Sequence, residues 1–356
     1  LVGGLADRLR AQGRTVLGPG QEGARLEGSK AYAKELCAAA RIPTAAFAIF
    51  DRLDDAIAHL RQSSGPYVIK ADGLAGGKGV LVTDDLAAAE RDVQDKLYGV
   101  AFGEAGRRVV IEQALAGMEI SLLALCDGRS AVPLPVARDY KRVGDGDEGP
   151  NTGGMGAHSP VPRVAEAVVS EAMDRIVEPA LAELARRGVE YRGVLYAGLM
   201  LTDDGVQLVE FNVRLGDPEA EVILPRLDGD VAELFCAAAS RHLPAAIPIS
   251  DDAAVCVVVA APGYPASPRT GEAIEGVDAA DDVEGVTVFH AGTKREHDGV
   301  LRSAGGRVLA VTGCAPKLDS ARDRAYEAVA QIGFPGATYR RDIAKDAMSA
   351  EVEPAL

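Results

Sequence analysis

The sequence predicts a mixed α/β (α+β) fold with more than one domain. Short apolar runs with the alternation of strands are interspersed with longer segments in which apolar residues recur every three or four positions, as in amphipathic helices. A length of 356 residues is enough for two or three domains that each bury a core. Glycine-rich turns join several of the predicted strands.

Composition and charge narrow the class of protein. Hydrophobic residues make up 47% of the chain and charged residues 26%, and no apolar run approaches the length of a membrane span. The formal charge of −15 disfavours nucleic-acid binding. Cysteines are dispersed and show no Cys-x-x-Cys spacing, which predicts neither a disulfide framework nor a zinc site. We therefore expect a cytoplasmic protein with small-molecule substrates and without nucleic-acid or membrane partners.

The start of the chain predicts a helix, a brief strand and a second helix. Apolar residues at 1, 2, 5 and 9 share one helical face, residues 15–17 have strand character, and Gly18-Pro19-Gly20 predicts a turn. Ser29 is a good N-cap for a helix that Pro43 ends. Lys30 then lies in the first turn of this helix, where a cation is disfavoured unless an anion lies nearby. A solvated surface lysine is the simpler interpretation of Lys30 alone.

A glycine-rich segment at 72–79 connects two predicted strands, 67–71 and 80–82. It is not a Walker loop, because Asp72 stands where the first glycine would be and a strand follows in place of a helix. Its glycines let the backbone approach a polyphosphate, and two lysines supply positive charge. The residues concerned are Lys70, Gly73, Gly76, Gly77, Lys78 and Gly79. A glycine-rich hairpin loop is the alternative.

Two helices, at 53–62 and 86–97, and a further strand, at 107–112, accompany this loop. The strand runs into the segment Glu112, Gln113, Ala114, Leu115, and Glu119 follows closely. Backbone groups here could pair with an adenine edge and Glu119 could hold ribose hydroxyls, although an exposed strand residue explains Glu119 equally well. Asp127-Gly128 predicts the turn of a hairpin formed by 120–126 and 130–134.

Residues 136–160 form the least regular region. The segment 144–149 matches G-x-G-x-x-G, but its three carboxylates would repel a pyrophosphate and no apolar strand precedes it. Long ordered loops in compact domains are often functional, so Asn151, Thr152, Gly153 and Gly154 are candidates for substrate contacts. Disorder is the competing explanation.

The stretch 206–219, VQLVEFNVRLGDPE, is the most informative in the chain. Alternation predicts that Leu208, Glu210, Asn212 and Arg214 share one face of a strand and that Val209, Phe211 and Val213 share the other. The oxygens of Glu210 and Asn212 suit a hard cation such as Mg²⁺. The alternative is an edge strand with one solvent-exposed face.

Helical periodicity covers 165–187, where Pro179 should cause a kink, and also 231–240. Strand 193–201 should pair with strand 206–213, and the sequence predicts a linker at 243–250.

The remainder of the chain predicts a smaller α/β domain with strands at 253–260, 286–290 and 308–312 and a helix at 318–332. Basic residues there, Lys294, Arg302 and Arg307, could clamp a phosphate. Surface charge is the commoner explanation.

Several longer sequence motifs resemble those of one protein family. They are LEGSK (26–30), VIKADGLAGGKGV (68–80), KRVGDGDEGPNTGGMGAHSP (141–160), LYAGLM (195–200), VEFNVRLGDPE (209–219) and HAGTK (290–294). The order of these motifs resembles that of the ATP-grasp ligases. Within that superfamily, the motifs at 151–156 and 214–219 resemble those of the glycinamide ribonucleotide synthetase family. The resemblance implies two lobes around ATP, with a mobile small lobe at about 46–115. The implied domains are a remnant of an N-terminal α/β domain at 1–28, an ATP-grasp domain at 29–243 and a C-terminal α/β domain at 244–356.

The resemblance also implies a reaction, in which ATP converts glycine to glycyl phosphate and the amine of 5-phosphoribosylamine displaces the phosphate, a step of purine biosynthesis. It assigns Lys30 and Lys70 to phosphates, the 73–79 loop to the γ-phosphate, Glu112 to Leu115 to adenine, Glu119 to ribose, and Glu210 with Asn212 to Mg²⁺ or Mn²⁺. On the acceptor side it suggests Asp139, Asn151, Arg214 and Asp217, with Lys294 and Arg307 as further candidates. We expect a monomer.

Two residues depart from the pattern that the resemblance implies. Leu215 replaces a phenylalanine and keeps an apolar contact, whereas Glu221 replaces a glutamine and adds a charge. Two other functions remain open at this point, a different ATP-grasp enzyme such as a biotin-dependent carboxylase subunit and a non-catalytic nucleotide-binding module. The chain also begins as though the front of its N-terminal domain were absent from this numbering.

Overall fold

A computed structural model of the chain describes residues 1–74, 79–99 and 103–348. The chain divides into two compact units, each built from segments that are separate in sequence. The first contains Leu1–Pro133, Glu166–Leu215 and Ala232–Ala245, and the second contains Leu134–Ala165, Gly216–Val231 and Ala246–Leu356. Within the described residues no helix combines the length and apolar character needed to cross a bilayer.

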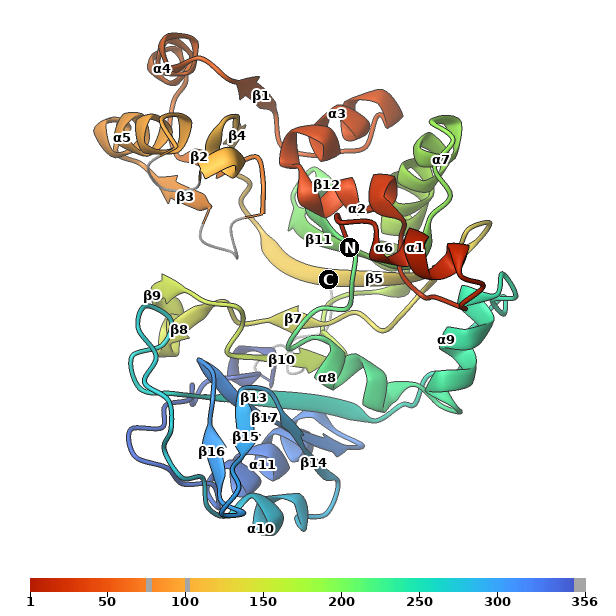
Figure 1. The fold of residues 1–356 in the computed structure, drawn as a ribbon, viewed down its shortest axis with the longest axis vertical. Helices are drawn as coiled ribbons and strands as arrows, with labels where there is room; N and C mark the ends of the chain where they lie inside the picture. Colours follow the sequence, from red (N-terminus) through yellow and green to blue (C-terminus); the bar gives the residue numbers. More distant parts are fainter. Residues whose placement is uncertain (75–78, 100–102, 349–356) are drawn as a thin grey trace. The chain divides into compact units, whose positions relative to one another are not determined.

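The first unit contains two antiparallel sheets (Figure 1). The small sheet has the order β1 (Phe47–Phe50), β4 (Val109–Gln113), β2 (Tyr67–Ala71), β3 (Val80–Thr83). The large sheet has the order β12 (Gly205–Asn212), β11 (Arg192–Thr202), β5 (Met118–Asp127), β6 (Ala131–Pro133). The predicted hairpins β5–β6 and β11–β12 are confirmed.

Two helices cover one face of the small sheet, α4 (Leu53–Gln62) and α5 (Leu86–Leu97), and both match their predicted bounds (Figure 1). Their apolar residues pack with the strands in one core, in which Leu60 and Val93 meet Ile69 and Ile111. The predicted N-cap of α3 is also confirmed, since the Ser29 hydroxyl accepts a hydrogen bond from the Tyr32 amide. The other helices of the unit are α1 (Leu5–Ala11), α2 (Gln21–Gly28), α3 (Lys30–Ala40), η1 (Gly103–Gly106), α6 (Glu166–Ala172), η3 (Met173–Val177), α7 (Glu178–Arg186) and α9 (Val231–Ala239).

The second unit is organised on a five-stranded antiparallel sheet. Its order is β14 (Val286–His290), β17 (Arg307–Ala315), β13 (Ala253–Ala260), β10 (Gly156–Ser159), β7 (Arg138–Asp139). Every residue of β13 is buried, as expected for a central strand covered on both faces. The remaining elements are β8 (Arg142–Gly144), η2 (Asp145–Asp147), β9 (Glu148–Asn151), α8 (Ala220–Ile223), η4 (Leu224–Arg226), α10 (Val277–Asp281), β15 (Thr293–Arg295), β16 (Leu301–Ser303), α11 (Leu318–Val329) and α12 (Lys345–Met348).

One of two predictions of local structure is wrong and the other is confirmed. Residues 15–17 form no strand; the carbonyls of Val16 and Gly18 accept hydrogen bonds from the Arg10 guanidinium in place of a neighbouring strand. The helical periodicity predicted at 165–187 is confirmed, because α6, the wider π-helical turn η3 and α7 follow one another without a gap, and the irregular turn lies just before Pro179. Proline has no N–H to donate to the carbonyl four residues earlier, so regular helical bonding cannot continue through this point.

A bulge in β12 overturns part of the predicted face pattern. The β11–β12 register shifts between Gly198, which faces Glu210, and Leu199, which faces Leu208, so Val209 is the extra residue. A bulge reverses the alternation beyond it. Leu208 is therefore buried together with Phe211, and it does not share the face of Glu210.

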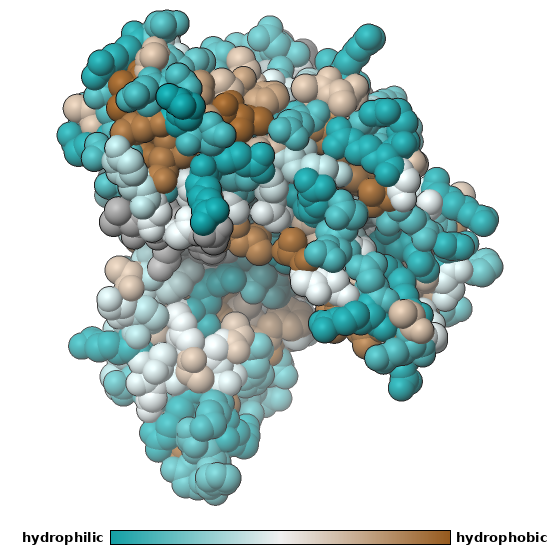
Figure 2. Space-filling view, turned by 45° about the horizontal axis from the view of Figure 1, so that its top comes forward, coloured by the Kyte–Doolittle hydropathy of each residue, from teal (hydrophilic) through white to brown (hydrophobic). Residues whose placement is uncertain are grey.

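On the face shown in Figure 2, hydrophilic residues dominate and apolar residues form small separate groups. Most large apolar side chains that the structure describes belong to the buried cores of the two units, and a few, such as Leu74 and Tyr98, are exposed.

Candidate functional site

Three charged side chains meet in the interior of the first unit. Glu112 on β4 lies between Lys34 on α3 and Lys70 on β2, with a distance of 2.9 Å from each ammonium nitrogen to a carboxylate oxygen. All three side chains are about 95% buried, with exposures of 4–5%. Buried charges persist only where they are paired, so this arrangement is a built feature of the fold.

Strand pairing explains how Lys70 and Glu112 come together. Val68 is the residue directly opposite Glu112 in the β2–β4 ladder, and Lys70 lies two positions further along the same face. The Lys70 ammonium also donates a hydrogen bond of 3.2 Å to the carbonyl of Val209, the bulged residue of β12. Lys70 thus connects the small sheet to the residue that precedes Glu210.

Glu210 and Asn212, the residues of the predicted metal site, both lie on β12 beyond the bulge and are partly exposed. The Lys30 ammonium lies 3.6 Å from a Glu210 carboxylate oxygen. Within the described residues no group of three or more His, Cys, Asp and Glu residues could hold a metal ion. At β12 itself, Glu210 and Asn212 offer one carboxylate and one amide to a cation.

The end of β12 is fixed by Glu27 of α2. One carboxylate oxygen of Glu27 accepts a hydrogen bond from the Val213 amide (2.9 Å), and the other accepts one from the Arg214 guanidinium (3.1 Å). The contact holds the backbone immediately after Asn212. Arg214, predicted on the acceptor side, makes its ion pair here within the first unit.

Asp72 anchors the start of the glycine-rich segment. Its Oδ1 accepts hydrogen bonds of 2.8 Å from the Ser29 hydroxyl and the Ala31 amide, and its Oδ2 accepts two from the Arg108 guanidinium. Gly73 packs so closely on Ala105 that an added Cβ would lie 2.6 Å from the alanine methyl group. At the far end, the Gly79 carbonyl accepts a hydrogen bond from the Ala71 amide. Gly76, Gly77 and Lys78 lie outside the described residues.

The segment after β4 runs from Gln113 through Ala114 and Leu115, which are exposed or half-buried, to β5. Glu119 is half-buried on β5, opposite Met200 of β11. Gly117 has a φ of +156°, and a Cβ on it would lie 2.0 Å from the Leu201 carbonyl oxygen, so only glycine fits this approach to β11. The predicted adenine and ribose contacts thus lie on a segment tied to the large sheet.

The second unit gathers another polar cluster around Arg307. The Arg307 guanidinium donates hydrogen bonds of 2.8 Å to the carbonyls of Gly153 and Asp217 and lies 2.9 Å from an Asp217 carboxylate oxygen. Asp139 is 8% exposed and lies 3.3 Å from the Lys141 ammonium. Burial raises the pKa of Asp139, whereas the charge of Lys141 opposes the shift.

Other predicted residues of this unit remain at its surface. Asn151 is exposed on β9, where it pairs with Arg142 of β8. The Lys294 side chain is 64% exposed and pairs with Glu296, and Arg302 pairs with Asp298. Each of the three basic residues of the predicted phosphate clamp is therefore paired with a carboxylate, since Arg307 pairs with Asp217.

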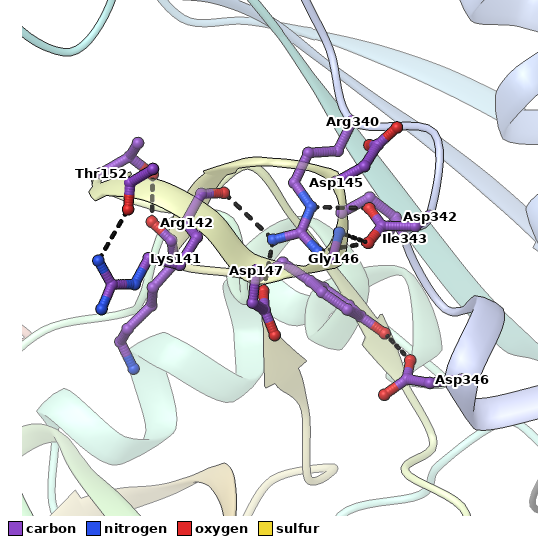
Figure 3. Close-up of polar contacts among 12 residues, drawn as sticks. Lys141, Arg142, Asp145, Gly146, Asp147, Thr152, Arg340, Asp342, Ile343 and Asp346 are labelled. Atoms are coloured by element: carbon purple, nitrogen blue, oxygen red, sulfur yellow. Dashed lines mark hydrogen bonds and ion pairs between the residues drawn. The ribbon is translucent and has the colours of Figure 1, made fainter.

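The acidic segment 145–147 is ordered and holds a later part of the chain (Figure 3). Asp145 accepts a hydrogen bond from the amide of residue 341, the Gly146 amide donates to Asp342, and Asp147 pairs with Arg340. Arg340 is 1% exposed, and although burial acts to lower its pKa, the hydrogen bonds and charges of Asp342 and Asp147 together raise the pKa above its usual value. The disorder considered for this region is overturned, and its carboxylates have a structural partner.

Comparisons with known proteins agree on one family. The model of the phosphoribosylglycinamide synthetase ATP-grasp (A) domain matches residues 28–220, and the model of the phosphoribosylglycinamide synthetase C domain matches residues 254–346. The phosphoribosylamine–glycine ligase of Streptomyces coelicolor is 49% identical over 354 residues, which is 98% of this chain and 82% of that protein. That of Brucella melitensis is 45% identical over 352 residues, 99% of this chain and 82% of that protein.

The chain belongs to the phosphoribosylglycinamide synthetase family. The crystal structure of phosphoribosylamine–glycine ligase from Thermotoga maritima superposes with a TM-score of 0.86 at 40% identity, covering 93% of this chain and 82% of that one. The biotin carboxylase domain of the Hydrogenobacter thermophilus 2-oxoglutarate carboxylase, solved with MgADP, shares the fold at 16% identity with a TM-score of 0.69, covering 98% and 80%. The predicted ATP-grasp fold is confirmed.

Sequence reasoning missed three residues of the site in the first unit. Lys34 follows Lys30 by four positions and so lies on the same face of α3, a spacing that could have revealed it. Glu27 belongs to the motif LEGSK, but its contact with residues 213 and 214 joins parts of the chain that are distant in sequence, so the motif alone does not indicate it. Arg108 contacts Asp72 across 36 positions, and no local pattern indicates that pair.

Proposed function

We propose that this chain is an ATP-dependent ligase that joins glycine to 5-phosphoribosylamine and forms glycinamide ribonucleotide, ADP and phosphate. The supporting observation is the constellation of the first unit, where the Lys34, Glu112 and Lys70 cluster and the Lys30 and Glu210 pair occur in a chain of this family. Cations poised beside a carboxylate and an amide on β12 suit a nucleotide polyphosphate with its metal ion.

In this proposal the nucleotide is held by the first unit. Lys30 and Lys70 bind phosphate oxygens, and the loop beginning at Gly73 and ending at Gly79 covers the γ-phosphate. The segment Glu112, Gln113, Ala114, Leu115 reads adenine, and Glu119 binds the ribose. Asp72 supports these roles because it ties the start of the loop to the first turn of α3, where Lys30 lies.

The oxygens of Glu210 and Asn212 fit Mg²⁺ or Mn²⁺, since a carboxylate and an amide on one strand face are hard ligands that leave room for phosphate oxygens and water. A bound divalent ion would neutralise phosphate charge during transfer. Lys30, 3.6 Å from Glu210, adds a fixed positive charge at the same place. Glu210 is thus proposed to hold the ion and to orient the Lys30 ammonium.

Glycine's carboxylate is a poor electrophile, so the proposed route passes through glycyl phosphate, in which phosphate has become a leaving group. Attack by the amine of 5-phosphoribosylamine then forms the amide, releases phosphate and releases a proton from the nitrogen. We propose Asp139, Asn151, Arg214 and Asp217 for the acceptor side, with Arg307 and Lys294 as further candidates. Arg307 is supported by its contacts with 153 and 217, whereas the exposed Lys294 has weaker support.

The proposal is tested by replacing Glu210. We expect Glu210→Gln to lower kcat by about 100-fold or more, the usual effect of removing one group that stabilises charge in a transition state. ADP release should depend on both glycine and 5-phosphoribosylamine. Glu35→Gln, an exposed substitution on α3, is the matched control and should retain wild-type activity. ADP release driven by bicarbonate and independent of glycine would overturn the assignment.

Domain boundaries at 28/29 and 243/244, a monomeric state and a cytoplasmic location complete the proposal. The dispersed free thiols, Cys37, Cys126, Cys236, Cys256 and Cys314, support a reducing compartment. Light scattering of the purified chain would test the monomer.

A further inference from the structure

Lys34 is the member of the buried cluster that no predicted role explains. It lies one helical turn after Lys30 on α3, among the buried residues Ala31, Leu36 and Cys37. Its side chain is 5% exposed. An ammonium group at such a position costs several kcal/mol in desolvation, which a leucine or methionine would avoid. Burial lowers the pKa of Lys34, and the negative charge of Glu112 opposes that shift.

The charges of the cluster suggest what Lys34 supplies. If Lys70 alone faced Glu112, the two would form a neutral pair and little field would remain for an anion. Two ammonium groups against one carboxylate leave one uncompensated positive charge. In an interior of low effective dielectric constant, such a charge acts strongly on a neighbouring phosphate.

Hydrogen bonds toward β12, direct or through Thr44, fix the positions of the Lys34 and Lys70 ammonium groups. The Lys34 ammonium donates a hydrogen bond of 2.6 Å to the Thr44 hydroxyl, which in turn donates one of 2.6 Å to the Leu208 carbonyl. Lys70 donates to the carbonyl of Val209, the next residue. Lys34, through the Thr44 hydroxyl, and Lys70, directly, are therefore linked to consecutive carbonyls of the bulge, just before Glu210.

We propose that Lys34 is a positioning residue of the nucleotide site, which shares the charge of Glu112 so that Lys70 keeps a net positive charge for a phosphate group of ATP or ADP. Through Thr44 it also fixes the small sheet and α3 against the bulge in β12. The Lys34 side chain is buried and acts through its neighbours Glu112 and Thr44. This inference rests on the proposed function.

The direct test is the affinity of the full chain for Mg·ADP, measured by isothermal titration calorimetry. We expect Lys34→Met to raise Kd about tenfold or more, the effect of one unit charge at ion-pair distance. Lys34→Arg, which keeps the charge, should recover part of the affinity. Lys96→Met is the matched control: Lys96 is also a buried lysine of the first unit, paired with Asp92 on α5, and its loss should lower Tm without changing Kd.

A second variant separates charge from packing. Glu112→Gln combined with Lys34→Met removes one negative and one positive charge, so Lys70 again carries an uncompensated charge. We expect the double variant to bind Mg·ADP more tightly than Lys34→Met alone. Unchanged Kd in Lys34→Met, or a double variant that binds more weakly still, would overturn the inference. A wild-type chain that binds Mg·ADP but does not ligate glycine would instead refute the proposed function, and the ratio of Kd values would still decide the role of Lys34.

Discussion

Glu221 shows how a single carboxyl group can carry a pH response in the second unit. It lies in α8, and its Oε2 is buried without a hydrogen-bond partner among the described residues. Burial, and then the negative charge of Asp217, raises the pKa of Glu221 to about 7, and Arg307 offsets only part of this shift. The carboxyl group therefore takes up a proton near neutral pH in the folded protein.

The sign of the effect on stability follows from proton binding. From pH 4.5, the ordinary pKa of the group, to about pH 7, folded Glu221 holds a proton that the unfolded chain has lost. Its contribution to stability is therefore present at low pH and is lost as the pH rises through this window. Glu221→Gln removes the titration and keeps the shape. We expect its Tm to match the wild type at pH 5 and to exceed it by roughly 2 °C or more at pH 8.

Circular dichroism melts from pH 5 to pH 8 check this prediction. Glu284→Gln serves as the control, because that side chain is 93% exposed and its removal should leave the pH profile unchanged. Parallel profiles for wild type and Glu221→Gln would show that Glu221 ionises normally.

Among single residues, the sequence can place those with a local signature. The N-cap Ser29 places Lys30 in the first turn of α3, and their spacing places Glu210 and Asn212 on one strand. Thr44 has no such signature, since its partner Leu208 is 164 positions away. Contacts of this kind depend on tertiary packing and cannot be predicted from local periodicity.

At the scale of elements, Asp72 links a helix, a strand and a loop. Its carboxylate caps the start of α3 through Ser29 and Ala31, and it also binds Arg108 just before β4. Asp72→Ala would leave these donors without their acceptor in a largely buried place. We expect a loss of about 2 to 3 kcal/mol in the free energy of unfolding.

The same substitution should raise KM for ATP, because both Lys30 and the base of the glycine loop are held by this carboxylate. Urea unfolding and steady-state kinetics measure the two effects. Asp85→Ala provides a matched comparison: Asp85 caps α5 through the Ala87 amide at an exposed position. It should cost about 1 kcal/mol without affecting KM. An unchanged KM in Asp72→Ala would mean that the loop is positioned independently of α3.

Element boundaries were predicted well where periodicity was long, as for α4 and α5, and poorly where a single residue alters the geometry. The bulge at Val209 reversed the face of Leu208, and nothing in the alternation of 206–213 indicated it. Bulges depend on how the partner strand is paired, so one strand read alone does not contain the information.

The whole molecule is built from two units whose segments alternate along the sequence. The described chain passes repeatedly between the units, at 133, 165, 215, 231 and 245. β7 and β10, from the middle of the sequence, pair into the sheet that contains β13 and β17. Loss of structure in one unit should therefore propagate to the other through these connections.

Arg340 offers a way to test this coupling. It is 1% exposed and joins the acidic segment at Asp147 to the later turn at Asp342, entirely within the second unit (Figure 3). Arg340→Leu would leave two carboxylates without their cation, a change that typically costs about 3 to 5 kcal/mol. If the units unfold cooperatively, hydrogen exchange should accelerate in β5 and β11 of the first unit as well as in β13 and β17.

The control is Arg61→Leu, which removes an exposed ion pair with Glu90 and should leave hydrogen exchange almost unchanged. Faster exchange confined to residues 134–165, 216–231 and 246–348 would instead show that the first unit holds its fold alone, despite its five covalent connections to the second.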